Sequence, residues 1–380
     1  MERNPLASSA SSTLLTTPQL STPLKMANLS GPASFSSLPV EMKTNVFAFI
    51  RKKKPTKAAV CLVSHEWRDV MAPMAFSNLT IARGDITAEM LSTLLEPGNG
   101  VIPHVKSLYI ARGGHEKLYD ECDYSKEITI MTIISELPEG ALYALAGEFN
   151  LSTGMLFHLL QHQTKIKRLD VVFNLRAGTR NMNYAHKAHE SWIAPRLANV
   201  ESLTLMPEDM GSGECKAAGL LVRSAPNLRS LRIATCRGCL SLMVYPDHPE
   251  ARPDWTVFGG PFESGSEPPR LKLSRMSLEQ VVLGRRAAAL IWGNVDLSKL
   301  KCLQIVNCET VDDLAIALAP VCNLTEPNIT MSRNSSPREH TIQAIAALLN
   351  SFNSLEVLWL DMADGRMIDV SCIARHTSLR

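Results

Sequence analysis

The chain has 380 residues, of which 45% are hydrophobic and 20% are charged, and its formal net charge is +2. This length allows two or three domains, and this composition allows a sizeable buried core. The nearly balanced charge gives no reason to expect nucleic acid or an anionic membrane surface as a partner. No stretch approaches the roughly 18 consecutive apolar residues of a membrane-spanning helix, so we expect no membrane partner.

Residues 1–35 differ from the rest of the chain. They are rich in Ser, Thr and Pro, and Glu2 is their single acidic residue. A segment of this composition buries too little apolar surface to fold, so we expect a disordered tail. Leu14–Leu15 is too short for the apolar core of a secretion signal. We therefore expect a location in the cytoplasm, the nucleus or both.

Residues 36–80 are expected to form three short helices. Pro39 suits the first turn of a helix, and Glu41 suits the positive helix end. Ser64 can cap a later helix that carries Trp67 on its apolar side. Three short helices in about 45 residues cannot enclose a full core and need a partner or a neighbouring domain. The apolar residues at the start of this segment therefore favour an interface.

This segment resembles an F-box. The match reads LPxE from Leu38, then VFAFI, then CLVSHEWRDV, and it covers the whole motif in the right order. The resemblance implies a face that binds a Skp-type adaptor. It assigns to that face the residues Leu38, Pro39, Glu41, Val46, Phe47, Val63 and Trp67. The alternative is an unrelated helical hairpin at the head of a globular domain.

From residue 101 onward one pattern recurs, apolar-x-x-apolar-x-apolar. Its eight copies start at Val105, Ile166, Val200, Leu228, Leu278, Leu300, Leu324 and Leu355. The second half of each copy alternates with period two, which predicts a short strand with one buried face. Residues 217–222, 314–321 and 342–349 show the spacing of amphipathic helices.

A strand and a helix in about 25 residues cannot bury both of their apolar faces alone. Stacking of successive units solves this problem and gives a solenoid. We therefore predict an α/β fold. A three-helix F-box is followed, over residues 81–380, by an irregular solenoid with a parallel sheet and outer helices. The Pro- and Gly-rich stretch 245–270 reads as an insertion, either a disordered spacer or a functional loop.

The copies resemble leucine-rich repeats. Residues 300–324, LKCLQIVNCETVDDLAIALAPVCNL, are similar to the cysteine-containing subtype, and so is LRSLRIATC from Leu228. Together with an F-box, this resemblance implies the substrate-recognition subunit of an SCF-type cullin–RING ubiquitin ligase, whose repeats bind an unknown target protein. Pro327 departs from the pattern, because Pro is confined to edges or bulges of sheets.

A second hypothesis is a non-catalytic leucine-rich-repeat scaffold whose F-box-like helices only cap the solenoid. The environment of Leu38–Pro39 distinguishes the two. A cap would bury these residues inside this chain, and an adaptor-binding F-box would leave them exposed.

We expect neither an enzyme nor a metal or cofactor site. The nine Cys residues are odd in number and scattered through apolar stretches, which is typical of reduced, buried thiols. Cys236 and Cys239 form a CxxC pair, but no second pair completes a zinc site. Packing explains Cys236 better, because the repeat pattern places a buried Cys there.

The end of the sequence starts another copy of the pattern, Ser378-Leu379-Arg380, after a helix expected over residues 367–374. The strand near Leu355–Leu360 would then keep an open edge. Exposed edges invite aggregation. We therefore expect that the chain is truncated or that another chain covers this end.

Overall fold

The computed structural model describes residues 38–43, 64–111, 124–174, 192–205, 212–234, 270–331, 339–362 and 368–379. The chain forms two units, Met1–Lys52 and Lys53–Arg380. Residues 40–43 of the first unit are helical, and the Lys43 N–H donates to the Pro39 carbonyl at 3.0 Å. This helix begins where the sequence predicts. All other described residues belong to the second unit.

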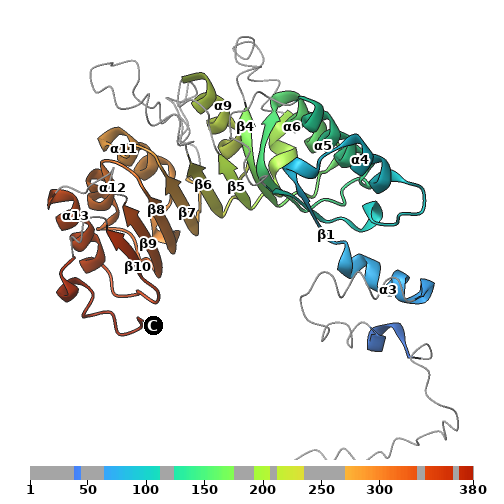
Figure 1. Ribbon diagram of the computed structural model, residues 1–380. Helices are drawn as coiled ribbons and strands as arrows, with labels where there is room; N and C mark the ends of the chain where they lie inside the picture. Colours follow the sequence, from blue (N-terminus) through green and yellow to red (C-terminus); the bar gives the residue numbers. More distant parts are fainter. Residues whose placement is uncertain are drawn as a thin grey trace, which may run out of the picture. The chain divides into compact units, whose positions relative to one another are not determined.

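The second unit is α/β and is built on one ten-stranded parallel sheet (Figure 1). Each strand pairs with the next strand along the chain, so every turn of the chain adds one strand beside the previous one. The strands are β1 (Asn78–Ala82), β2 (Ser107–Ala111), β3 (Ala144–Ser152), β4 (Arg168–Asn174), β5 (Ser202–Leu205), β6 (Ser230–Ala234), β7 (Arg275–Glu279), β8 (Cys302–Val306), β9 (Glu326–Met331) and β10 (Trp359–Met362).

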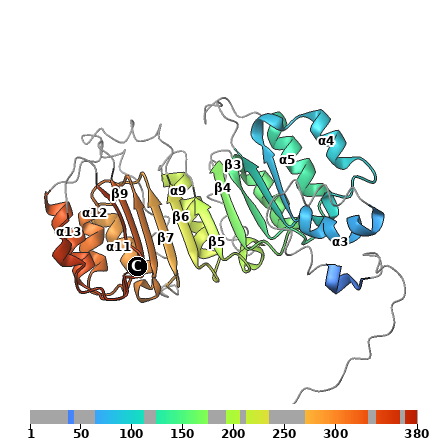
Figure 2. The ribbon, with the colours of Figure 1, turned by 60° about the horizontal axis from the view of Figure 1, so that its bottom comes forward.

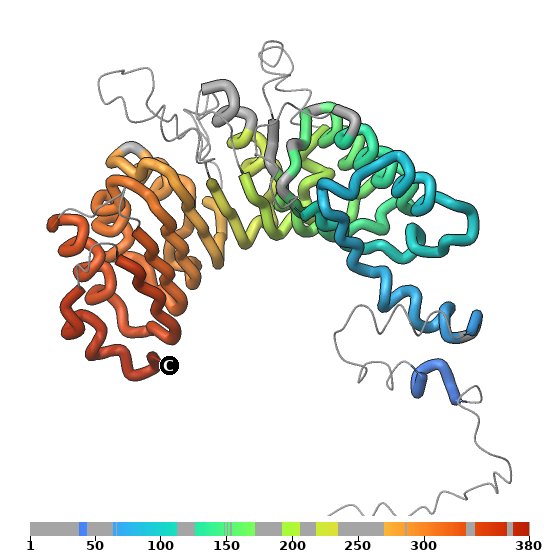
Figure 3. Tube along the Cα trace, in the orientation of Figure 1, coloured from blue at the N-terminus to red at the C-terminus, as the bar shows by residue number. Residues whose placement is uncertain are grey.

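Helices lie along one face of this sheet (Figures 1 and 2). Parallel neighbours need such crossover connections, and the tube in Figure 3 shows the chain passing repeatedly from strand to helix and back. The α-helices with described bounds are α3 (His65–Ala75), α4 (Ala88–Leu95), α5 (Tyr124–Glu136), α6 (Thr153–His162), α9 (Ser212–Arg223), α11 (Arg285–Asn294), α12 (Val311–Leu318) and α13 (Glu339–Asn350), and residues 192–197 are also helical. The 3₁₀ turns are η2 (Arg83–Asp85), η3 (Ile102–His104), η6 (Leu297–Lys299) and η9 (Val370–Cys372).

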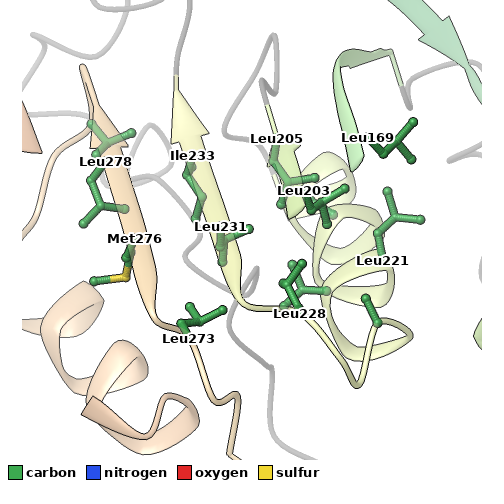
Figure 4. Packing of buried hydrophobic residues seen from close by; sticks show 14 of the residues in the cluster. Leu169, Leu203, Leu205, Leu221, Leu228, Leu231, Ile233, Leu273, Met276 and Leu278 are labelled. Atoms are coloured by element: carbon green, nitrogen blue, oxygen red, sulfur yellow. The ribbon is translucent and has the colours of Figure 1, made fainter. Parts of the chain in front are cut away.

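The apolar positions of the repeated pattern make the core. In the turn that carries β6, Leu228, Leu231 and Ile233 are fully buried, and Figure 4 shows them beside the buried residues of neighbouring strands. Leu221 of α9 is buried in the same cluster. Burial of one such side chain contributes about 1.5–3 kcal/mol. The same pattern is buried in turn after turn, so the core is continuous along the sheet.

A second repeated feature is a ladder of shared hydrogen bonds where the strands begin. The carbonyl just before a strand accepts two backbone N–H groups, one from the equivalent residue of the next turn and one from its successor. These bonds measure 2.7–3.2 Å. The acceptors are Ser77, Lys106, Tyr143, Lys167, Glu201, Arg229, Ser274, Lys301 and Thr325. The ladder sets the register of each turn on the preceding one.

The structure confirms strands at seven of the eight predicted copies. The strand predicted in the copy that starts at Leu278 is wrong. β7 lies earlier, and the matching copy starts at Leu273 and continues through Met276 to Leu278. Gln280 has φ of 55°, a left-handed conformation that ends the extended run. The apolar residues after it are still buried, which is why the pattern looked like a separate copy.

Two strands were not predicted. β1 belongs to a copy that starts at Phe76 and continues through Leu79 and Ile81, so it extends across residue 80, the predicted end of the F-box-like segment. In β3 the copy begins with Leu142 and Leu145, but Gly147 takes the third apolar position. A search for apolar residues at fixed spacing therefore does not detect β3.

Gly147 is required by close packing against the neighbouring strand. Its φ is 148°, and a Cβ atom at this position would lie 2.4 Å from the Ile110 carbonyl oxygen. Residues with a side chain rarely adopt this φ. The register between β3 and β4 shifts between Gly147 and Asn150. The glycine thus marks an irregularity that lengthens β3.

Pro327 is buried inside β9, a strand with a neighbour on each side. Its pairing with β8 includes the partners Leu303 and Pro327, whereas its pairing with β10 begins at Asn328 and Trp359. The ladder to β10 therefore starts one residue after the proline. Pro327 therefore lacks its N–H at a level of the sheet where the outermost strand, β10, has not yet begun.

The predicted helices show mixed agreement. α9 and α13 contain the predicted stretches 217–222 and 342–349, whereas α12 ends three residues before the predicted end at 321. The helix predicted over 367–374 is wrong. Residues 368–379 form η9 and turns, and the His376 imidazole lies 3.0 Å from the Leu349 carbonyl oxygen of α13. No described residue pairs with the outer edge of β10.

Candidate functional site

The residues assigned to the adaptor-binding face lie in both units. Pro39 and Glu41 are exposed and Leu38 is half-buried. The neighbouring apolar side chains of Val40 and Met42 are 58% and 53% exposed. The first unit therefore presents apolar side chains to solvent. The remaining assigned residues, apart from Trp67, lie outside the described residues: Val46, Phe47 and Val63.

Trp67 lies in α3 of the second unit. Ser64 caps this helix as the sequence predicts, because its hydroxyl accepts the Trp67 N–H at 3.3 Å. Trp67 itself is half-buried. Met71 and Ala72 of α3 are buried, and α3 packs against η3 near the start of the sheet. One face of this helix is thus buried, although Met71 and Ala72 are not part of the hydrophobic cluster that runs along the sheet.

The face of the sheet opposite the helices carries mostly polar side chains, and several of its charged side chains form ion pairs. The Arg232 guanidinium donates to both carboxylate oxygens of Glu279, at 2.8 and 2.6 Å. The Ser277 hydroxyl donates to the same carboxylate at 2.9 Å. A bidentate pair of this kind fixes both side chains. The middle of the open face is therefore a hydrogen-bonded network.

The network continues toward both ends of the open face. Asp170 pairs with Arg168 and accepts the Thr204 hydroxyl at 2.8 Å. On the other side, Arg275 lies 3.8 Å from the Glu326 carboxylate.

Two aromatic side chains of the open face lie beyond these pairs. Tyr109 on β2 is 46% exposed and Trp359 on β10 is 62% exposed. Exposed aromatic residues of this kind are frequent anchors in protein interfaces.

Two cysteines of the turn that carries β8 link neighbouring turns. The Cys308 thiol lies 3.1 Å from the Leu278 carbonyl oxygen, and the Cys322 thiol lies 3.5 Å from that of Leu297. Burial raises the pKa of both thiols to about 12. A thiol that stays protonated is a poor nucleophile. These free, buried thiols agree with the predicted structural role. Cys236 and Cys239 lie outside the described residues.

The contact that most resembles a catalytic pair joins α5 and α6. The Ser135 hydroxyl lies 2.7 Å from His158 Nε2 and also donates to the Met131 carbonyl at 2.8 Å. A hydroxyl has one hydrogen, so this serine can only accept from the histidine, which is the wrong direction for an activated nucleophile. The His158 ring packs on His162 at 4.6 Å between centroids. The two histidines lie four residues apart on α6, whereas the contact between Ser135 and His158 joins residues 23 positions apart.

Within the described ranges, no three His, Cys, Asp or Glu side chains come together in a way that could hold a metal ion. Of the helices that the structure describes, none has the length and apolar character needed to cross a bilayer.

No protein-family model matches this chain, and a search of curated proteins finds no match. The assignment of a function therefore rests on the residues and contacts described above.

Proposed function

We propose that this protein is the substrate-recognition subunit of an SCF-type cullin–RING ubiquitin ligase. The F-box-like segment, which begins at residue 36 and ends before the first turn of the sheet, binds a Skp-type adaptor. The ten-stranded part that follows is an irregular leucine-rich-repeat solenoid that binds the target protein. The chain performs no chemistry itself. It raises the effective concentration of the target near the conjugating enzyme.

The observation that carries this proposal is the repeated unit of the sheet. Strands follow in chain order, and the same shared carbonyl recurs at nine successive turns. In the turn that starts at Leu300, the residues Leu303, Ile305, Cys308 and Leu324 are buried. These are the positions that the cysteine-containing leucine-rich repeat requires to be apolar. Chain-order stacking is the expected geometry of such repeats.

Support for the F-box comes from the first unit and from α3. Pro39, Val40 and Met42 are exposed, which suits a surface that another chain covers. The Ser64 cap begins α3 where the F-box motif predicts its third helix. The order of the two parts, F-box first and repeats second, is the usual order in such receptors.

The alternative is a leucine-rich-repeat scaffold whose F-box-like helices only cap the sheet. One observation favours it: α3 buries Met71 and packs against η3, as a capping helix would. The two functions differ at Leu38–Pro39. Adaptor binding requires Pro39 to be exposed, whereas the scaffold function does not.

The experiment is co-purification of a Skp-type adaptor with the tagged full chain. Leu38→Ala with Pro39→Ala should abolish adaptor binding, because truncation of a central interface anchor costs about 2 kcal/mol or more. The matched control is Val370→Ala with Leu379→Ala, two apolar residues exposed at the other end of the chain. We expect unchanged binding for the control and unchanged melting for both. If the first variant still binds the adaptor, the face that includes Leu38 and Pro39 is excluded as the adaptor-binding surface. Failure of the unmodified chain to bind would leave the scaffold as the function.

A further inference from the structure

One edge of the sheet, where the strands begin, carries an unusual set of charges. Each turn exposes three positions there: the residue before the first apolar residue of the pattern, and the two residues after it. Paired strands place equivalent positions side by side, about 4.8 Å apart. From β4 to β8 the positions are Lys165, Lys167 and Arg168; Asn199, Glu201 and Ser202; Asn227, Arg229 and Ser230; Lys272, Ser274 and Arg275; and Lys299, Lys301 and Cys302.

We call these fifteen positions the basic edge. Eight of them are Lys or Arg, and one is acidic. All eight basic side chains belong to exposed residues. The whole chain has a formal net charge of only +2, so the excess is a local feature. A cluster of one sign on one edge produces a directed field that attracts partners of opposite charge.

Among the described residues, five of these eight cations form no ion pair. Lys167 pairs with Glu201 at 2.8 Å, Arg168 pairs with Asp170 of the open face, and Arg275 lies 3.8 Å from Glu326, which takes the equivalent position on β9. The other five cations have no carboxylate within ion-pair distance among the described residues. They are Lys165, Arg229, Lys272, Lys299 and Lys301.

Acidic residues lie on the parts of the sheet around the basic edge. Beyond the end of β8, at the opposite edge of the sheet, the residues include Glu309, Asp312 and Asp313. On the start side the cations stop at β9 and β10, where Glu326 and Glu356 take two of the equivalent positions. The cations on the start side are therefore concentrated in the turns from β4 to β8, and Lys106 of the β2 turn is one further lysine at an equivalent position.

Two carboxyl groups beside the edge respond to this field. The pKa of Glu201 is lowered, first by its hydrogen bond and charge contact with Lys167 and further by Arg229. The pKa of Asp296 is lowered mainly by the Ser298 hydroxyl, with Lys299 among the further causes. Nearby cations thus favour the charged form of Glu201 and contribute to that of Asp296.

We propose that the basic edge of β4 to β8 binds an acidic, Asp- and Glu-rich segment of a protein partner. A carboxylate-bearing chain fits better than a single-stranded nucleic acid, because none of the fifteen positions is aromatic and base stacking needs aromatic platforms. Five strands span about 19 Å, which an extended segment of about six residues covers. That this partner is the ubiquitination target rests on the proposed function; the binding itself does not.

The test measures fluorescence anisotropy with the full chain at about 50 mM and about 200 mM salt. The probe is a labelled peptide of about twelve residues that alternates Glu and Ser, and its control replaces every Glu by Gln. We expect binding of the acidic peptide only, and weaker binding at the higher salt. An oligothymidylate of equal charge should bind less tightly than the peptide.

Matched charge reversals locate the site. Lys301→Glu and, separately, Lys299→Glu should each weaken peptide binding about fivefold, because each removes an attraction and adds a repulsion. Arg285→Glu makes the same charge change outside the edge, on a side chain that is 94% exposed, and should change affinity less than twofold. Melting curves confirm that each variant is folded.

Three results would overturn the proposal: no binding of the acidic peptide, equal weakening by Arg285→Glu, or tighter binding of the oligothymidylate. The last result would assign the edge to nucleic acid. None of these results depends on adaptor co-purification, so the adaptor proposal stands or fails separately.

Discussion

The turns that carry β3 and β8 join the same hydrogen-bonded ladder with different side chains. In the β8 turn, every apolar position of the pattern is filled, and Cys308 and Cys322 reach the carbonyls of the preceding turn. In the β3 turn, Gly147 replaces the third apolar residue and the register shifts after it. Both turns nevertheless donate the same pair of N–H groups to the ladder.

A buried amide beside β3 shows how the irregular turn is held. Gln163 is fully buried three residues before Ile166, at the position that Leu297 occupies before Leu300. Its oxygen accepts the Leu142 N–H at 3.0 Å, and its nitrogen donates to the Pro138 carbonyl at 3.3 Å. A regular turn thus depends on apolar packing, whereas the irregular turn depends on a satisfied polar contact and on a glycine. Three substitutions probe this difference.

The largest effect is expected at Gly147. Gly147→Val places a side chain against the Ile110 carbonyl oxygen and forces a φ that valine does not adopt, so we expect a loss of more than about 3 kcal/mol in the free energy of unfolding. Urea denaturation followed by circular dichroism measures it. Gly154→Ala in α6, where no atom lies within 4 Å of the new Cβ, should keep or raise stability by up to about 1 kcal/mol. Similar curves for both variants would contradict the role given to Gly147.

A smaller loss is expected at Gln163. Gln163→Leu restores the apolar residue of the regular turns but leaves the Leu142 N–H and the Pro138 carbonyl without their partner. An unsatisfied buried group costs about 1–3 kcal/mol, so we expect a net loss of about 2 kcal/mol in urea unfolding. Gln161→Leu on the exposed side of the same helix should change stability by less than about 0.5 kcal/mol. A variant as stable as the unmodified chain would mean that the amide is dispensable.

The smallest effect concerns the thiols of the β8 turn and depends on pH. The pKa of Cys308 is about 12 in the folded chain, because burial disfavours the thiolate, against about 8.5 in the unfolded chain. Below about pH 8.5 both states are protonated, and the stabilising contribution is fully present. As the pH rises toward 12, the unfolded chain loses its proton first. Stability then falls by at most about 1.4 kcal/mol per pH unit for each thiol.

We therefore expect the unmodified chain to lose more stability between pH 8 and pH 10 than Cys308→Ala does, in urea unfolding with reductant present. Cys302→Ala, which removes a half-exposed thiol, should alter the pH slope less. Equal slopes for the unmodified chain and Cys308→Ala would show that this thiol titrates alike in both states.

The sequence predicts the regular part of the fold well, because the apolar pattern of a regular turn is compatible with only one arrangement of strand and buried face. Leu303 and Ile305 are buried and alternate with the less buried Cys302, Gln304 and Val306, as the residues of a strand with one covered face must. Leu278 was predicted to be the first apolar residue of a copy, whereas it is the last one of the copy that starts at Leu273. The error arose because buried apolar residues continue past the turn at Gln280. β3 was missed because Gly147 has no side chain for a pattern to detect.

The candidate sites also differ in whether the sequence predicts them. The exposed Pro39 and the Ser64 cap follow from local chemistry that the sequence displays. The basic edge does not, because its cations come from four separate turns and share no spacing along the chain. Only the pairing of β4 through β8 brings Lys167, Arg229 and Lys301 into one row.

The sequence by itself determined that short strands alternate with helices, that the apolar residues of the pattern are buried and that Ser64 begins a helix. These features depend on residues a few positions apart, whose interactions hold in any arrangement of the chain. Tertiary structure alone decided the register between turns, the place of the irregular β3 and the convergence of charges at one edge. Those features depend on hydrogen bonds between residues 24 to 46 positions apart, for which no local pattern exists.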